Sequence, residues 1–439
     1  MAYGHRVNRR HLEFVCGVLA VGLVAGVAGG ATTVLLHSIQ HLTYHYSFGS
    51  LLEGVTGSSP VRRAVGPMIG GALAGAGWWW LRRRSPVPSL TEVIARPGPM
   101  PRLTMSIDAG LQVLLVGTGA SLGREGAPRQ FAAALGDWAT SIFAPPGCRS
   151  SLTERDREIL LACAAGAGLA AVYSVPVGGA LFALQILLRT WNLRAAGTAL
   201  ITSSLAVAVA APVTHDETVL HWPDASLSAL LTGLAVVLTP LMLGVGLGFN
   251  GLMAYARHRG PAPTWRLIPA IAGAGLLVGI CSHHWPELPG NGKSVLTVSL
   301  NSGLTVASAG AILLLKPLLT AVFLRAGAVG GMLTPALATG AALGSAVALS
   351  INALTPVHVS VPAVSLACAT GVLAITQGTP LWAAIFVWEL ARPPWWLLVV
   401  FLAAAFAAHF LGGLLARFRS REAQVATLSK PESATTEGG

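Results

Sequence analysis

Long apolar runs, interrupted by glycine and proline, limit how this chain can fold more than any other feature. Of its 439 residues, 53% are hydrophobic and only 10% are charged, whereas soluble domains carry roughly 25% charged residues. A run of about 20 apolar residues can cross a bilayer as a helix, because every backbone group is bonded inside the helix. The sequence therefore predicts an all-α integral membrane protein.

Several of the apolar runs are too short or too interrupted to be simple spanning helices. The chain contains 51 glycines and 27 prolines, residues that break or end helices. Lipid cannot satisfy the freed backbone groups, so a broken helix must face protein or a watery cavity. We expect full and broken helices together, with breaks in "GLQVLLVGTGASLG", "EILLACAAGAGLAAVY", "PVGGALFALQILL", "GGMLTPALATGAALG" and "PLWAAIFVWEL".

Basic residues gather between the apolar runs and at both ends of the chain. The formal net charge is +11, from 28 Lys and Arg against 17 Asp and Glu. This placement indicates membrane topology rather than nucleic-acid binding, because basic loops stay cytoplasmic. We expect a multi-pass protein of the cell (inner) membrane with both termini cytoplasmic, and an outward-facing loop at 214–225, which contains no Lys or Arg.

The two halves of the chain resemble each other. The run "LACAAG" at 161–166 recurs as "LACATG" at 366–371, and three later residues of the first half have counterparts at the same mutual spacing. Repeats of this kind often have inverted topology and place a substrate site at their interface. The predicted division is a cytoplasmic N-terminus (1–10), a first transmembrane repeat (11–213), an external loop (214–225), a second transmembrane repeat (226–420) and a disordered cytoplasmic tail (421–439).

Metal and redox chemistry have little support in the sequence. The five cysteines are scattered without paired spacing and are typical of small apolar residues. His37, His41 and His45 recur every four residues and would share one helix face, a spacing that can bind a metal. An integral membrane enzyme using this stripe is the alternative function, but no acid or cysteine joins it. We expect no metal and no cofactor.

One carboxylate stands out in the stretch "GTGASLGREGAPRQF" at 117–131. An ionised Glu125 in hydrocarbon would cost at least ~2.5–3.5 kcal/mol, which makes it a functional candidate by default. The structural alternative is an ion pair with Arg124 or Arg129. Gly123 and Gly126 leave the backbone amides open, and such amides at a helix start favour an anion.

The same pattern occurs in the second half and, more weakly, near residue 85. Gly330 and Gly331 precede Pro335 and an alanine-rich helix, while Ser85 lies before "LTEV". Helix starts from both halves could direct their amides at one anion, which a carboxylate would mimic. Lys316 lies before this second loop and would favour anions there, although a place at the cytoplasmic edge would explain it equally.

These motifs resemble the CLC family of chloride channels and proton-coupled chloride exchangers. "GREGAP" is similar to the Gly-Arg-Glu-Gly-Pro motif of that family, "GGMLTP" is similar to its Gly-Gly-x-Phe-x-Pro motif, and "RSPVP" weakly resembles a third. The resemblance implies a homodimer that moves chloride or a similar anion, with protons as second substrate in exchangers. It implies a gate at Glu125, anion contacts at Ser85, Gly126, Ala127, Met332 and Leu333, and support from Gly123, Arg124, Lys316, Gly330 and Gly331. A shift of one residue would put Pro86 in place of Ser85.

The sequence departs from the family pattern on the inner side. Where many exchangers have a second glutamate, this chain has Gln185 and Ile186, and the inner tyrosine is replaced by Arg417 or Phe418. Channel and exchanger therefore both remain open, and we expect weak proton coupling.

Overall fold

The structure is a computed structural model. It describes residues 2–96, 98, 100–142, 152–214, 229–258 and 264–428, with the side chains of 2–9 and 419–428 left out. Helices form almost all regular structure in these ranges, and the one β-type pairing there is an isolated bridge between two glycines. The predicted all-α class is confirmed.

The helices follow one another through short connections in the described ranges. Their order is α1 (Ala2–Tyr44), α2 (Leu51–Gly57), α3 (Pro60–Arg84), α4 (Leu90–Ala95), α5 (Arg102–Gly117), α6 (Gly126–Ile142), α7 (Glu154–Tyr173), α8 (Pro176–Leu181), the π-helix η1 (Phe182–Leu188), α9 (Leu193–Thr214), α10 (Ala229–Val237), α11 (Thr239–His258), α12 (Leu267–Cys281), α13 (Lys293–Leu300), α14 (Val306–Arg325), α15 (Leu333–Leu354), α16 (Val361–Gln377), α17 (Pro380–Ala391) and α18 (Leu397–Leu428).

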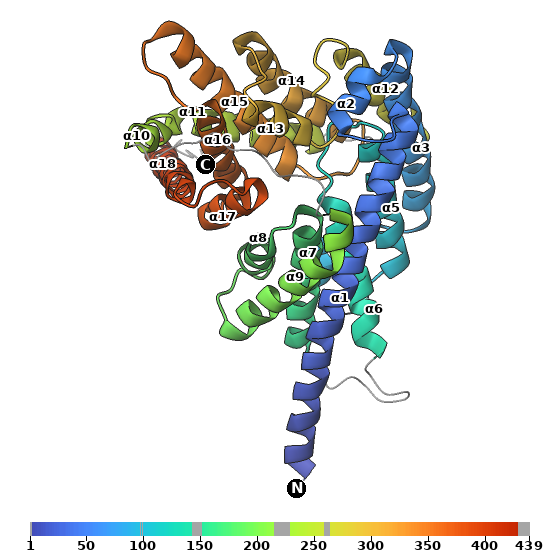
Figure 1. Ribbon diagram of the computed structural model, residues 1–439. Helices are drawn as coiled ribbons and strands as arrows, with labels where there is room; N and C mark the ends of the chain where they lie inside the picture. The colour runs from blue at the N-terminus through green and yellow to red at the C-terminus, as the bar shows by residue number, and fades with distance from the viewer. Residues whose placement is uncertain are drawn as a thin grey trace, which may run out of the picture.

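The repeated sequence segments form matching pairs of helices. In the first half α7 ends at Ser174 in the left-handed conformation (φ 55°), and Pro176 then begins α8. In the second half α16 ends at Gly378 (φ 70°), and Pro380 begins α17. A left-handed residue ends a helix, and proline suits the first turn of the next. The short helices α8 and α17 lie against each other (Figure 1), where the Trp382 indole donates to the Gly178 carbonyl at 2.9 Å.

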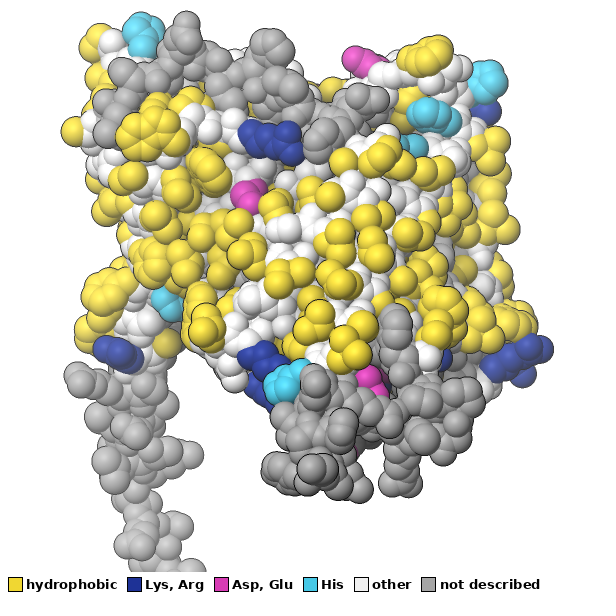
Figure 2. Space-filling view, turned by 60° about the horizontal axis from the view of Figure 1, so that its bottom comes forward, with side chains coloured by type: hydrophobic (Ala, Val, Ile, Leu, Met, Phe, Trp, Pro, Cys, Tyr) yellow, Lys and Arg dark blue, Asp and Glu magenta, His cyan; other side chains and the backbone are white. Residues whose placement is uncertain are grey.

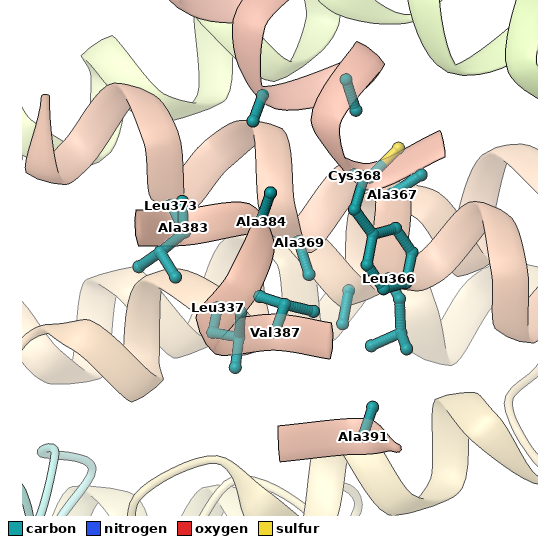
Figure 3. Close-up of a cluster of buried hydrophobic side chains, with 14 of the residues drawn as sticks. Leu337, Leu366, Ala367, Cys368, Ala369, Leu373, Ala383, Ala384, Val387 and Ala391 are labelled. Carbon is teal, nitrogen blue, oxygen red and sulfur yellow. The ribbon is translucent and has the colours of Figure 1, made fainter. Parts of the chain in front are cut away.

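Small apolar residues let the helices of the second half pack closely. Figure 3 shows Leu337 of α15 beside Val387 of α17, in one buried cluster with Leu366, Leu373 and Ala384. All five are at most 2% exposed. Glycines of α15 let its backbone approach α16 closely, since a Cβ at Gly340 would meet the Ala369 backbone and one at Gly344 would meet the Ser365 backbone. Such small residues are usual between helices in membranes, where lipid gives no hydrophobic drive for helix association.

The outer surface suits a bilayer. Within the described residues, five helices are long and apolar enough to cross a membrane, or six if the bent pair α10–α11 is one span. Shorter apolar helices include α12, α16, α17 and the segment Pro176–Leu188. Figure 2 shows a face covered largely by hydrophobic side chains, with charged groups few and mainly near its edges. The mixture of long and short helices agrees with the predicted full and broken helices.

The predicted segment boundaries differ from the helix ends. Helix α1 already begins at Ala2, and α9 continues to Thr214, while 215–228 of the expected external loop lie outside the described residues. Helix α18 continues beyond residue 420 to Leu428, and the disorder expected for the tail stays a prediction. Residues 429–439 lie outside the description.

Candidate functional site

The two glycine loops of the predicted anion site meet at a short antiparallel bridge. The Gly123 amide donates to the Gly331 carbonyl at 2.7 Å, and the Gly331 amide donates back to the Gly123 carbonyl at 2.9 Å. Helices α6 and α15 begin directly after these loops. The structure therefore brings two helix starts from opposite halves of the chain to one point, as the motifs predict.

The side chain of Glu125 crosses this junction and is fully buried. The Leu333 amide donates to Oε1 of Glu125 at 2.7 Å, and the Thr334 hydroxyl donates to Oε2 at 3.1 Å. Both donors lie in the first turn of α15, where the helix dipole favours negative charge. Hydrogen bonds to a charged group contribute about 1.5–3 kcal/mol each, so these two donors would offset part of the cost of burying an ionised carboxylate.

The neighbouring arginines direct their described contacts elsewhere. Nε of Arg129 donates at 2.7 Å to the backbone carbonyl of Glu125, and its guanidinium lies over the Phe182 ring, 5.0 Å from the centroid. Arg124 donates to the Val172 carbonyl at 3.3 Å and lies 5.1 Å from the centroid of Tyr173. The described hydrogen bonds to the Glu125 carboxylate come from α15, and the Arg129 guanidinium adds an electrostatic interaction with the same residue.

Two glycines make room for this carboxylate. A Cβ added at Gly123 or at Gly331 would collide with the side-chain oxygens of Glu125. A Cβ at Gly330 would instead meet Leu122, and one at Gly126 would meet the Gln112 side-chain oxygen. Gly123 and Gly331 therefore serve both the backbone bridge and the close approach of the carboxylate.

Helix α14 braces the loops around the bridge. The fully buried ammonium of Lys316 donates to the carbonyls of Leu288 and Gly290 at 2.8 and 2.7 Å. One turn later the Thr320 hydroxyl donates to the Ser121 carbonyl at 2.8 Å. Lys316 is therefore buried inside the protein, and its two described hydrogen bonds position loops instead of contacting Glu125.

The remaining predicted anion contacts fall into two groups. Gly126 and Ala127 are the first residues of α6, and Met332 and Leu333 lie at the start of α15. These four residues therefore lie beside Glu125. Ser85 ends α3 and takes part in a hydrogen bond with Thr104 at 3.4 Å. No described contact joins Ser85 to the Glu125 junction, and its role stays a prediction.

A cavity with basic walls borders the junction. Its volume is about 70 Å³, enough for a small anion and water. Thr334 lines this cavity and also donates to the Glu125 carboxylate, so this side chain is common to the cavity and the junction. The described residues that line it include no Asp or Glu, and its polar or charged lining consists of Arg124, Tyr173, Ser174, Thr214, Asn291, Lys293, Thr297, Thr334 and Arg392.

Three polar residues at or near the site were missed by sequence reasoning. Thr334 and Tyr173 carry no charge, and nothing local marks them. Asp108 is 1% exposed and accepts hydrogen bonds from the Trp78 indole at 2.7 Å and from Gln112 at 2.8 Å. An acid in the apolar run at 103–117 was a detectable signal, since intramembrane acids are rare.

The positions that the resemblance assigns to the inner side lie in η1 and α18. Gln185 and Ile186 lie in η1, where Ile186 packs against the core of the second half. Phe418, near the end of α18, is 61% exposed. Glu389, the counterpart of Gln185 in the repeat, accepts from the Val177 and Gly178 amides at 3.0 and 2.6 Å. That glutamate therefore joins α17 to the start of α8 in the other half.

The histidine stripe does not form a metal site with the described residues. His45 has a left-handed backbone just after α1, and the His41 ring contacts Tyr46 edge-on at 4.4 Å. No group of three or more His, Cys, Asp or Glu side chains suited to a metal occurs in the described ranges.

Comparisons with known proteins identify the family. Residues 70–412 match the model of the voltage gated chloride channel family. The chain belongs to this family. It is similar to the voltage-gated ClC-type chloride channel ClcB of Escherichia coli (strain K12), with 28% identity over 398 residues, covering 87% of this chain and 90% of ClcB. The predicted CLC resemblance is confirmed.

Solved CLC structures share the fold. A slow cyanobacterial Cl⁻/H⁺ antiporter superposes with a TM-score of 0.75 at 20% identity, covering 91% of this chain and 95% of that one. A CLC-type fluoride/proton antiporter gives a TM-score of 0.67, also at 20% identity, covering 90% and 95%. The arrangement of full and broken helices is therefore the CLC fold, and CLC proteins are channels or transporters rather than enzymes.

Proposed function

We propose that this CLC protein moves chloride, or a similar small anion, across the membrane along a pathway gated by Glu125. One observation carries the proposal: the Glu125 carboxylate accepts a hydrogen bond from the Leu333 amide at the start of α15. An amide at a helix start is a ready anion site. The side chain thus stands where a transported anion would bind.

Protonation supplies the switch. The ionised carboxylate accepts from Leu333 and Thr334 and competes with an anion for both donors. A protonated carboxyl has lost the charge that holds it there, so it leaves the amides more readily and an anion replaces it. The basic cavity beyond Thr334 raises the local anion concentration. Anion flux should therefore rise as pH falls.

The experiment is anion flux from liposomes with simultaneous proton recording, in the unmodified protein and in Glu125→Gln. Glutamine mimics the protonated gate, so flux should become independent of pH and any proton coupling should vanish. Glu158→Gln is the matched control, because Glu158 pairs with Arg155 at the start of α7, away from the bridge. Persistence of the original pH dependence in Glu125→Gln would reject the gate.

The degree of proton coupling is a separate proposal. The relative ClcB is named a channel, whereas both solved neighbours are named antiporters. Gln185 and Ile186 offer no carboxylate in η1 for a fixed inner proton relay. We propose weak coupling, with water as the remaining proton route.

Assembly and orientation extend the proposal. We infer a homodimer with one pathway per subunit, because the family resemblance implies it. We also infer an inner-membrane protein with cytoplasmic termini, because basic residues gather at both ends of the chain. Light scattering of the detergent-purified protein tests the dimer. Cysteine labelling of each end in inside-out vesicles tests the orientation.

A further inference from the structure

Tyr173 is the last residue of α7, and its ring contacts Arg124, the residue before Glu125. The next residue, Ser174, takes the left-handed conformation and ends the helix there. The ring lies 5.1 Å below the Arg124 guanidinium and meets Phe386 of the other half edge-on, with centroids 5.8 Å apart. These contacts fix the direction of the phenol, whose side chain lines the basic cavity.

The Tyr173 hydroxyl oxygen is buried and has no hydrogen-bond partner among the described residues. The side chains of Thr334 and Asn291 lie beside it, but neither offers acceptable hydrogen-bond geometry. Buried hydroxyls are nearly always paired, and an unpaired one costs about 1–3 kcal/mol. Because the Tyr173 side chain lines the cavity, the hydrogen-bond acceptor of its hydroxyl can be a ligand that enters the cavity.

The surroundings decide the chemistry of that partner. Arg124, Lys293 and Arg392 line the same cavity, and its described lining contains no carboxylate. The Thr334 hydroxyl, now donated to Glu125, becomes free when that carboxylate leaves. Two hydroxyl donors and a positive field suit a small anion.

We propose that Tyr173 donates its phenol hydrogen bond to the transported anion on the cavity side of Glu125. This assignment rests on the proposed gate and adds a ligand to it from α7, an element that none of the three motifs contains. The anion takes the Tyr173 and Thr334 hydroxyls together, one from each half of the chain. The site is therefore complete only after Glu125 has released Thr334.

The test compares Tyr173→Phe with the unmodified tyrosine in the Glu125→Gln background, where the gate is held neutral. Phenylalanine keeps the ring contacts with Arg124 and Phe386 and removes only the hydroxyl. Chloride affinity, measured by calorimetry on purified protein, should fall about tenfold, the loss expected for one hydrogen bond to a charge. The KM for chloride flux should rise by a similar factor.

Two controls separate a ligand from a structural role. Tyr255→Phe changes a tyrosine on α11 that is 57% exposed, and it should leave chloride affinity unchanged. The melting temperature of Tyr173→Phe should equal or exceed that of its parent, because the hydroxyl has no hydrogen-bond partner of acceptable geometry among the described residues. A lower melting temperature with unchanged affinity would show a structural role and overturn the assignment.

The outcomes also distinguish this inference from the gate. If Glu125→Gln removes the pH dependence of flux but Tyr173→Phe binds chloride as its parent does, only the Tyr173 assignment fails. If Glu125→Gln keeps the pH dependence, the gate fails, and the Tyr173 assignment fails with it.

Discussion

Gly123 and Gly331 exchange two backbone hydrogen bonds, of 2.7 and 2.9 Å. Beside this bridge the Leu333 amide donates to the Glu125 carboxylate, although 208 residues separate the two in the sequence. The bridge holds the starts of α6 and α15 at a fixed distance. Because both residues lack a side chain, the Glu125 carboxylate can lie across the junction. The geometry of the gate therefore depends on two glycines that never contact an anion through a side chain.

Gly331→Ala should disturb the gate without unfolding the protein. The added Cβ would collide with the Glu125 carboxylate, and overpacking of this kind costs about 1–3 kcal/mol. We expect chloride affinity to fall about tenfold in calorimetry. Gly310→Ala is the control, since a Cβ there meets no atom within 4 Å. Equal affinity in both variants would make the glycine loop a packing turn only.

Thr334→Val should loosen the gate. The Thr334 hydroxyl donates to the Glu125 carboxylate at 3.1 Å, so its loss removes one of the two hydrogen bonds that hold this side chain at the start of α15. Anion flux at a given pH should rise, by up to about tenfold for a bond of ~1.4 kcal/mol. Thr334→Ser keeps a hydroxyl and should behave as the unmodified protein. A flux that is the same for valine and threonine would contradict the contact.

Asp156 should couple stability to acid pH. It lies in the first turn of α7 and bonds Arg10 of α1 and Arg194 of α9, each at 2.8 Å. Burial raises the pKa of Asp156, but hydrogen bonds from Thr153 and Arg10 and the charge of Arg194 outweigh it, and the pKa is lowered. This stabilisation is present above the unfolded pKa of about 3.9 and is lost as pH falls through the lower folded value.

Asp156→Asn should therefore lower the melting temperature at neutral pH. We expect a loss of about 1–2 kcal/mol, because both arginines are partly exposed and screened. The difference from the unmodified protein should shrink below about pH 4. Glu154→Gln, an exposed carboxylate in the same turn, is the control. A melting temperature for Asp156→Asn that matches the control would contradict the role of this cluster.

Proton coupling should be weak in the unmodified protein and unaltered or stronger in Ile186→Glu. Ile186 lies in η1. According to the family resemblance, many exchangers have an inner glutamate at this position. Flux stoichiometry in liposomes measures the coupling. Substantial uphill proton movement driven by a chloride gradient in the unmodified protein would reject the channel-like interpretation. If such movement were unaltered in Ile186→Glu, water alone would supply the route.

The sequence by itself determined the class of protein, the family and the place of Glu125. Apolar runs require helices because lipid leaves backbone groups no other partner. The glycines around Glu125 predict open amides from local geometry alone, and the repeated "LACA" segments predict matching helices. These features are local, so their periodicity and spacing are visible in the chain.

Only the tertiary structure decided which groups meet at the gate. Thr334 and Tyr173 carry no local signal, because their roles come from contacts between the two halves. Glu389 likewise finds its partners at the start of α8, more than two hundred residues away. A buried polar group is selected by what packs around it, and that packing brings together helices whose separation along the chain says nothing about their distance in space.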